Sequence, residues 1–154
     1  MNLQDIRSHF KDYAKDIKLN LGSVLSEEGA PGLDKGQIYG SALAAAYAVR
    51  NDHLIEAVLD EAGEDLSDAQ IEAAKIAATL MAMNNVYYRT LHIMKGGDDY
   101  LKMPANLRMN MSKKHDADPL DYEYYALAVS CVNGCGMCVD AHVRQLDKKD
   151  QSKQ

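Results

Sequence analysis

Tryptophan is absent from the sequence of 154 residues, which also has a single phenylalanine and only three prolines. The sequence is rich instead in alanine, leucine, methionine, lysine and the two acidic residues. Most of these residues favour helices over strands. The composition therefore predicts an all-α protein.

No stretch rich in proline, glycine or serine divides the chain, and 154 residues suffice for one domain with its own core. We therefore expect a single domain over residues 1–154. Long apolar runs are missing too, because no window of about 18 uncharged apolar residues occurs and the N-terminus has no apolar signal core. These two absences predict a soluble, cytoplasmic protein.

Positive charge is in deficit, since the formal net charge is −6 at pH 7. An acidic surface attracts neither nucleic acid nor an anionic membrane. We expect no partner of either kind, which leaves small molecules or other proteins.

Apolar residues recur at helical spacing through the first part of the chain, about 1–94. Residues 38–51 and 53–63 indicate an αα-hairpin, and Ser67 is a candidate N-cap for a long core helix over 71–94. Before them, one covering helix ending near Gly22 is predicted by a series of apolar residues three and four apart: Leu3, Ile6, Phe10, Tyr13, Ile17 and Leu21.

The second part of the chain begins with a polar connector, about 95–119, which glycines and prolines interrupt. We expect irregular structure there, with at most one short helix near 103–111. In the half that follows, about 120–154, one helix stops at Gly134 and a second helix begins directly after it. The chain thus contains a second αα-hairpin.

A weak internal repeat relates the two hairpins. A shift of 85 residues pairs Tyr39 with Tyr124, Leu54 with Val139, Val58 with Val143 and Ser67 with Ser152. In the first copy the long core helix follows, whereas in the second copy the sequence stops shortly after Ser152. We therefore expect the second half to lack its last long helix, so that another subunit would have to cover its apolar faces.

The three cysteines all lie between residues 131 and 138, too close together to cross-link distant parts of a fold. Cys135 and Cys138 form a C-x-x-C motif at a predicted helix start. The helix dipole stabilises a thiolate there by about 0.3–1 kcal/mol, less than the roughly 2 kcal/mol needed to ionise a thiol near neutral pH. His142, four residues after Cys138 on the same helical face, is the group that could supply the difference.

Two distance estimates extend this site. Side chains three apart on a helix have Cβ atoms about 5–6 Å apart, whereas a disulfide needs about 3.5–4.5 Å, so a Cys135–Cys138 bond would distort the first turn and be easy to reduce. Glu123 and His142 lie on antiparallel helices about 16 Å and 12 Å from the turn between them. A Glu side chain spans much of that difference, so a Glu–His–Cys relay is allowed.

Other interpretations of these residues stay open. Glu123 alone is typical of a solvated first-turn residue, and His142 alone of a surface histidine. Cys131 is expected to be a small core residue beside Leu127. Alternatively, a metal-binding or iron–sulfur module is formed by Cys131, Cys135, Cys138 and His142.

Two further groups of residues have structural interpretations. We expect Asn84 and Asn85 in a buried structural network. We expect gap-filling roles for Met103, Met109 and Met111.

Four segments together resemble a known family. They are YAKDIKLNL (13–21), MNNVYYR (83–89), LRMN (107–110) and the pattern E-x11-C-x2-C-x3-H, formed by Glu123, Cys135, Cys138 and His142. This combination is similar to the alkyl hydroperoxidase D (AhpD) proteins of bacteria, in the carboxymuconolactone decarboxylase-like superfamily. The resemblance spans essentially the whole chain.

The resemblance implies an antioxidant peroxidase that reduces organic hydroperoxides, and in some members peroxynitrite. Cys138 would become a sulfenic acid, Cys135 would resolve it as a disulfide, and Glu123 with His142 would relay the proton. It further implies no bound cofactor, electrons from a protein-bound dihydrolipoamide, transfer to a peroxiredoxin partner (AhpC), and a helical homotrimer whose chain continues with a long helix. Met137 stands where family members often have histidine, so we expect slower or differently pH-dependent turnover.

Three alternatives to direct peroxidase activity remain at this point. The first is a dithiol–disulfide reductase that serves a peroxiredoxin and reacts poorly with peroxide. The second is the metal-binding module that uses the three cysteines and His142. The third is a decarboxylase-like activity that does not require the cysteines.

Overall fold

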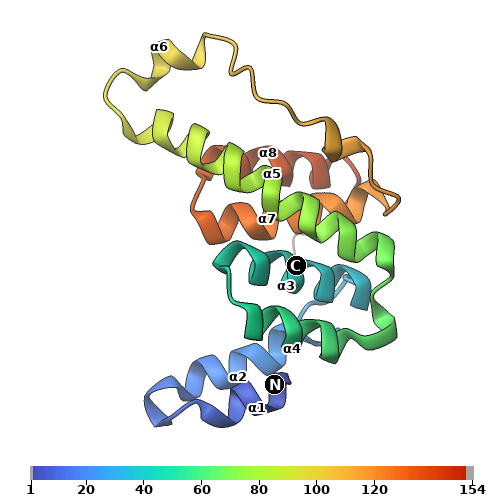
Figure 1. Ribbon diagram of the computed structural model, residues 1–154. Helices are drawn as coiled ribbons and strands as arrows, with labels where there is room; N and C mark the ends of the chain where they lie inside the picture. Colours follow the sequence, from blue (N-terminus) through green and yellow to red (C-terminus); the bar gives the residue numbers. More distant parts are fainter. Residues whose placement is uncertain (1, 152–154) are drawn as a thin grey trace.

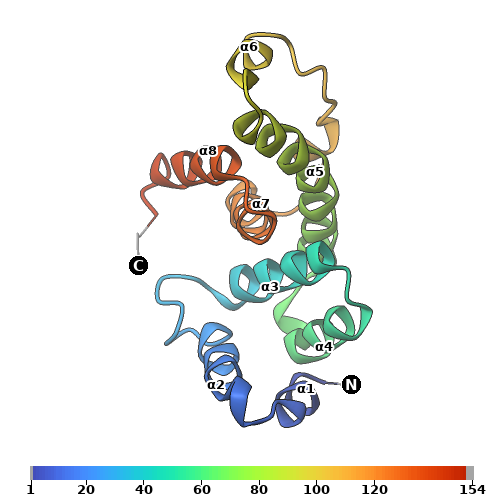
Figure 2. The ribbon, with the colours of Figure 1, turned by 90° about the vertical axis from the view of Figure 1, so that its left-hand side faces the viewer.

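The computed structural model describes residues 2–151, which form eight α-helices and no strand, as the composition predicts. None of the described helices is long and apolar enough to cross a membrane. The helices stack in an elongated bundle, with α1 and α2 at one end and α6 at the other (Figures 1 and 2). In chain order they are α1 (Leu3–His9), α2 (Lys15–Val24), α3 (Lys35–Val49), α4 (Asp52–Ala62), α5 (Asp68–Ile93), α6 (Gly97–Leu101), α7 (Pro119–Asn133) and α8 (Gly136–Asp147).

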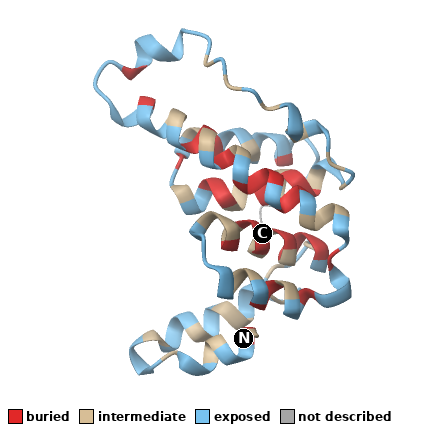
Figure 3. Cartoon of the chain, in the orientation of Figure 1, coloured by how far each residue is buried: buried red, intermediate tan, exposed pale blue. Residues whose placement is uncertain are grey.

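The core lies where α3, α5 and α7 meet, and buried residues concentrate in these helices (Figure 3). Tyr125 of α7 is fully buried against Gly40 of α3, where a larger residue would overlap the tyrosine ring. Its hydroxyl donates a hydrogen bond of 2.9 Å to the carbonyl oxygen of Gly36. Close packing at Gly40 thus sets how near α3 and α7 approach each other.

Capping residues fix where the core helices begin. Asp34 and Ser67 accept hydrogen bonds from the backbone N–H of Gln37 and Gln70, three residues on, at the starts of α3 and α5. The amide nitrogens of the same two glutamines donate to the Asp121 carboxylate, at 3.1 and 3.0 Å. Asp121 lies in the first turn of α7 and is buried. One carboxylate therefore joins the beginnings of all three core helices.

The expectation of one covering helix over residues 3–22 is wrong. A 3₁₀ turn (Asp12–Ala14) separates α1 from α2, and Tyr13 and Ile17 are 90% and 59% exposed. Leu3 alone among the described residues of α1 is buried, in contact with the core. The regular spacing of apolar residues continued across the break, so spacing alone could not reveal it.

The connector is mostly irregular, as predicted, but its short α-helix lies outside the predicted stretch. No helix covers 103–111: α6 lies before this stretch, and a 3₁₀ turn (Asn110–Lys113) overlaps only its end. Asn106 has a left-handed backbone with φ of 54°, which interrupts any helix there. Met109 packs against the core, whereas Met103 and Met111 are 60% and 44% exposed and fill no gap.

The two hairpins, α3–α4 and α7–α8, exist as predicted, but their offset is 84 residues rather than 85. The left-handed residues that end α3 and α7 are Arg50 and Gly134, and the N-caps that follow are Asn51 and Cys135. Each pair differs by 84. The described residues contain no counterpart of α5 after α8.

Candidate active site

The turn between α7 and α8 presents the two cysteines of the C-x-x-C motif. Gly134 ends α7 with φ of 66°, a conformation that glycine adopts at little cost. Cys135 is then the N-cap of α8, and its sulfur accepts a hydrogen bond of 3.4 Å from the backbone N–H of Cys138. A disulfide joins the two sulfurs, with Cα atoms 5.3 Å apart. The start of α8 and the disulfide are thus one structural unit.

Glu123 and His142 are in direct contact next to this turn. Glu123 Oε2 lies 2.7 Å from His142 Nδ1, and the two side chains are 22% and 14% exposed. The estimate of axial distances along α7 and α8 therefore brought the right pair together. An Nδ1–H that donates to the carboxylate leaves Nε2 as the ring nitrogen free to exchange a proton.

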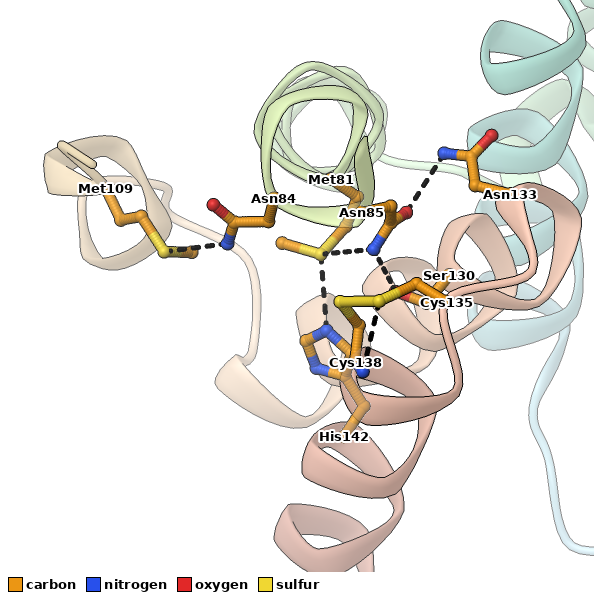
Figure 4. The surroundings of a disulfide bond; sticks show 9 residues. All are labelled: Met81, Asn84, Asn85, Met109, Ser130, Asn133, Cys135, Cys138 and His142. Atoms are coloured by element: carbon orange, nitrogen blue, oxygen red, sulfur yellow. Dashed lines mark hydrogen bonds between the residues drawn. A yellow bond between two sulfur atoms is a disulfide. The ribbon is translucent and has the colours of Figure 1, made fainter. Parts of the chain in front are cut away.

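Behind the disulfide lies a hydrogen-bond network from α5 and α7 (Figure 4). Asn85 donates 3.0 Å to the hydroxyl of Ser130 and accepts 2.9 Å from the side chain of Asn133. The carbonyl of Ser130 in turn accepts from the backbone N–H of Cys135 at 3.1 Å. The network holds the turn that carries Cys135 against α5 and confirms the expected buried network for Asn85. The same expectation is wrong for Asn84, which is buried but whose side chain, among the described residues, hydrogen-bonds only to the sulfur of Met109.

Met81 of α5 is a site residue that the sequence did not identify. Its sulfur lies 3.3 Å from His142 Nε2 and 3.8 Å from Asn85 Nδ2, and the residue is 1% exposed. Figure 4 shows Met81 between the imidazole and α5. A methionine on a long apolar helix looks like any core residue in sequence, so no signal distinguished it.

A cavity of about 390 Å³ opens beside Cys138 and His142. Cys138 is 7% exposed and lines this cavity, whereas Cys135 is 0% exposed and does not. A small molecule in the cavity would therefore lie against Cys138 and not against Cys135. The remaining lining residues are mostly apolar: Met81, Asn84, Tyr88, Met109, Met137, Ala141 and Arg144.

Cys131 does not behave as expected. It is exposed on α7, where Ser130 occupies the buried position instead, so it is not a core residue. Partial desolvation raises the pKa of the Cys131 thiol, which makes it less reactive. Among residues 2–151, no group of three or more His, Cys, Asp or Glu side chains is arranged to hold a metal ion. The structure does not bring Cys131 together with the other three residues as a metal site.

Comparison with known proteins agrees with this site. Alkyl hydroperoxide reductase AhpD of Coxiella burnetii (strain Dugway 5J108-111) is 49% identical over 151 residues, covering 98% of this chain and 85% of the relative. The chain belongs to the AhpD family. AhpD of Rhodospirillum centenum is 47% identical over 99% of this chain and 80% of its own length, and AhpD of Solibacter usitatus is 44% identical over 100% and 85%.

Residues 98–154 also match the carboxymuconolactone decarboxylase family. This match includes α7, α8 and the disulfide, so the part of the chain that carries the disulfide is also the part that matches the wider family. The relatives bear the name of an alkyl hydroperoxide reductase, which makes this chain an oxidoreductase by family.

Proposed function

We propose that this AhpD protein reduces organic hydroperoxides through a dithiol–disulfide cycle at Cys135 and Cys138. The observation that carries the proposal is that three features lie together: Cys138, which lines the cavity, the sulfur of Cys135 bonded to it, and the Glu123–His142 pair. The apolar lining suits the organic part of such a substrate.

In the oxidising step, the Cys138 thiolate attacks the terminal oxygen of the hydroperoxide. An S–O bond forms, the O–O bond breaks, and the leaving oxygen takes a proton supplied through His142 and departs as an alcohol. Cys138 is then a sulfenic acid. The Cys135 thiolate attacks its sulfur, which forms the disulfide and releases hydroxide, and this becomes water on protonation. Glu123 keeps the imidazole in orientation throughout.

Reduction of the disulfide completes the cycle. We propose dihydrolipoamide, carried by a partner protein, as the electron donor: its two thiols exchange with the Cys135–Cys138 bond, which leaves lipoamide and the reduced dithiol. The reduced protein can also pass its electrons to a peroxiredoxin of the AhpC type. We expect a homotrimer, which light scattering would test.

One observation favours a second candidate, a dithiol–disulfide reductase with little peroxidase activity of its own. Met137 lines the cavity directly before Cys138, and a thioether can neither accept nor donate a proton there. Proton transfer then depends on His142. If this limits the peroxide step severely, the protein serves mainly to reduce its peroxiredoxin.

The test counts free thiols per chain before and after one equivalent of cumene hydroperoxide, with peptide mapping and a Cys138→Ser control. We expect the loss of two thiols as a Cys135–Cys138 disulfide, reversal by dihydrolipoamide, and no such loss in the variant. Three thiols untouched by peroxide would reject the peroxidase. Exchange with dihydrolipoamide in that case would support the reductase.

A further inference from the structure

Asn84 is a buried amide whose hydrogen-bonding groups are almost unused. It is 6% exposed, and its Oδ1 has no hydrogen-bond partner within residues 2–151. Its Nδ2 donates only to the sulfur of Met109, at 2.9 Å. A thioether is a weak acceptor, and a buried polar group left without a partner destabilises the folded protein. The fold alone gives no reason for an amide at this position.

The next residue on α5 shows what a structural amide looks like here. Asn85 is 1% exposed, donates to Ser130 and accepts from Asn133, so both ends of its amide are paired. Figure 4 shows the two asparagines side by side on α5, with Asn84 turned toward Met109 and Asn85 toward α7. Burial on this helix therefore does not by itself leave an amide without partners.

Asn84 lines the same cavity as Cys138 and His142. His142 Nε2 is in a similar position, because its neighbour is the Met81 sulfur at 3.3 Å. The cavity thus holds two nitrogen groups that face only thioethers. An oxygen atom of a bound molecule is a stronger acceptor than sulfur and would replace these contacts at little cost.

We propose that Asn84 binds the hydroperoxide, donating a hydrogen bond from Nδ2 to the oxygen that leaves. This inference rests on the proposed peroxidase function. When Cys138 attacks and the O–O bond breaks, negative charge develops on the leaving oxygen. The Asn84 amide stabilises that charge while the proton arrives through His142, so Asn84 acts as a fixed donor in the transition state.

The test compares three reactions of the wild type with the same reactions of two variants, Asn84→Leu and Asn84→Met. Each variant replaces the amide with an apolar side chain of similar size. The reactions are oxidation of the reduced protein by cumene hydroperoxide, alkylation of Cys138 by iodoacetamide, and reduction of the disulfide by dihydrolipoamide. We expect peroxide oxidation to slow at least tenfold, equivalent to about 1.4 kcal/mol. The other two rates stay within twofold, because neither reaction has a leaving peroxide oxygen.

Asn85→Leu serves as the structural control, since it breaks the network behind Cys135 and should lower the melting temperature and disturb all three reactions. Equal losses in all three for the Asn84 variants would make Asn84 structural and overturn the inference. Peroxide oxidation at the wild-type rate would overturn it too, while the peroxidase function stands. A wild type that iodoacetamide labels at Cys138 but peroxide does not oxidise would reject both.

Discussion

Replacing Glu123 by glutamine tests whether its contact with His142 serves the chemistry. The two side chains meet at 2.7 Å and are mostly shielded from solvent. A hydrogen bond to a charged group contributes about 1.5–3 kcal/mol, whereas a neutral one contributes about 0.5–1.5 kcal/mol. The variant Glu123→Gln therefore loses about 1–1.5 kcal/mol of stabilisation for the imidazolium formed in the proton relay.

That loss predicts a rate of Cys138 oxidation about tenfold slower, since about 1.4 kcal/mol corresponds to a factor of ten. A further loss follows if the glutamine donates to Nδ1 and reverses the tautomer, as happens in other relays of this kind. The assay is stopped-flow oxidation of the pre-reduced protein by cumene hydroperoxide, in a single turnover, so that no electron donor is required.

The matched control is Asp140→Asn, which removes the same charge from an exposed position on α8. We expect it to react within twofold of the wild type. If Glu123→Gln also stays within twofold, the contact has no catalytic role. If both variants slow equally, the effect comes from net charge near the site and not from the hydrogen bond to His142.

Three further predictions concern residues around the site and core. Cys131→Ser should leave peroxide oxidation unchanged, because Cys131 is exposed and outside the cavity; a loss of activity in the same assay would restore the third cysteine to the mechanism. Burial, with Glu123 nearby, raises the pKa of Tyr122 to about 12, so its contribution to stability is complete below about pH 10 and roughly 2–3 kcal/mol of it is lost as the pH rises to 12. Tyr122→Phe should remove that loss in alkaline denaturation curves, and a slope equal to that of the wild type would contradict the assignment. Gly40→Ala should lower the free energy of unfolding by about 3 kcal/mol in urea denaturation, because its Cβ would overlap the Tyr125 ring, and a change below about 0.5 kcal/mol would show that α3 and α7 can move apart.

Local signals in the sequence were sufficient for the helices that carry the site. The sequence predicts the ends of α5, α7 and α8 to within a few residues. The signals were the N-cap Ser67, the helix stop at Gly134 and the periodic spacing of apolar residues. Helix rise alone showed that a contact between Glu123 and His142 was allowed, because the two helices are joined by a tight turn, and the structure contains that contact. The roles of these residues in catalysis remain predictions.

The parts that sequence could not provide depend on contacts between distant segments. Met81 reaches His142 from α5, 61 positions earlier in the chain, and Met109 reaches Asn84 from the irregular connector. No local sequence pattern predicts such long-range contacts. For Cys131 a local pattern was misleading. Its spacing of four residues from Leu127 suggested that it is buried, but the buried residue at this part of α7 is Ser130.

The offset of 84 residues pairs the two hairpins position by position, and only the second hairpin carries the cysteines and His142. In this alignment Cys138 corresponds to Leu54 and His142 corresponds to Val58, and both of these residues lie on α4. Val58 is 2% exposed, and both residues line an apolar cavity of about 400 Å³ with Leu3 and Leu25 from the N-terminal segment. The N-terminal segment therefore covers the face of α4 that corresponds to the face of α8 with Cys138 and His142.

On α8 the equivalent face lies instead beside α5 and the connector, which leave a cavity next to Cys138; α5 contributes Met81 and Asn84 to it, and the connector contributes Met109. A thiol or imidazole at Leu54 or Val58 would be enclosed by apolar side chains, with no carboxylate in place of Glu123, since the matching residue on α3 is Tyr39. The same hairpin is thus a core element where an apolar segment covers it, and it borders a cavity where α5 and the connector lie beside its second helix.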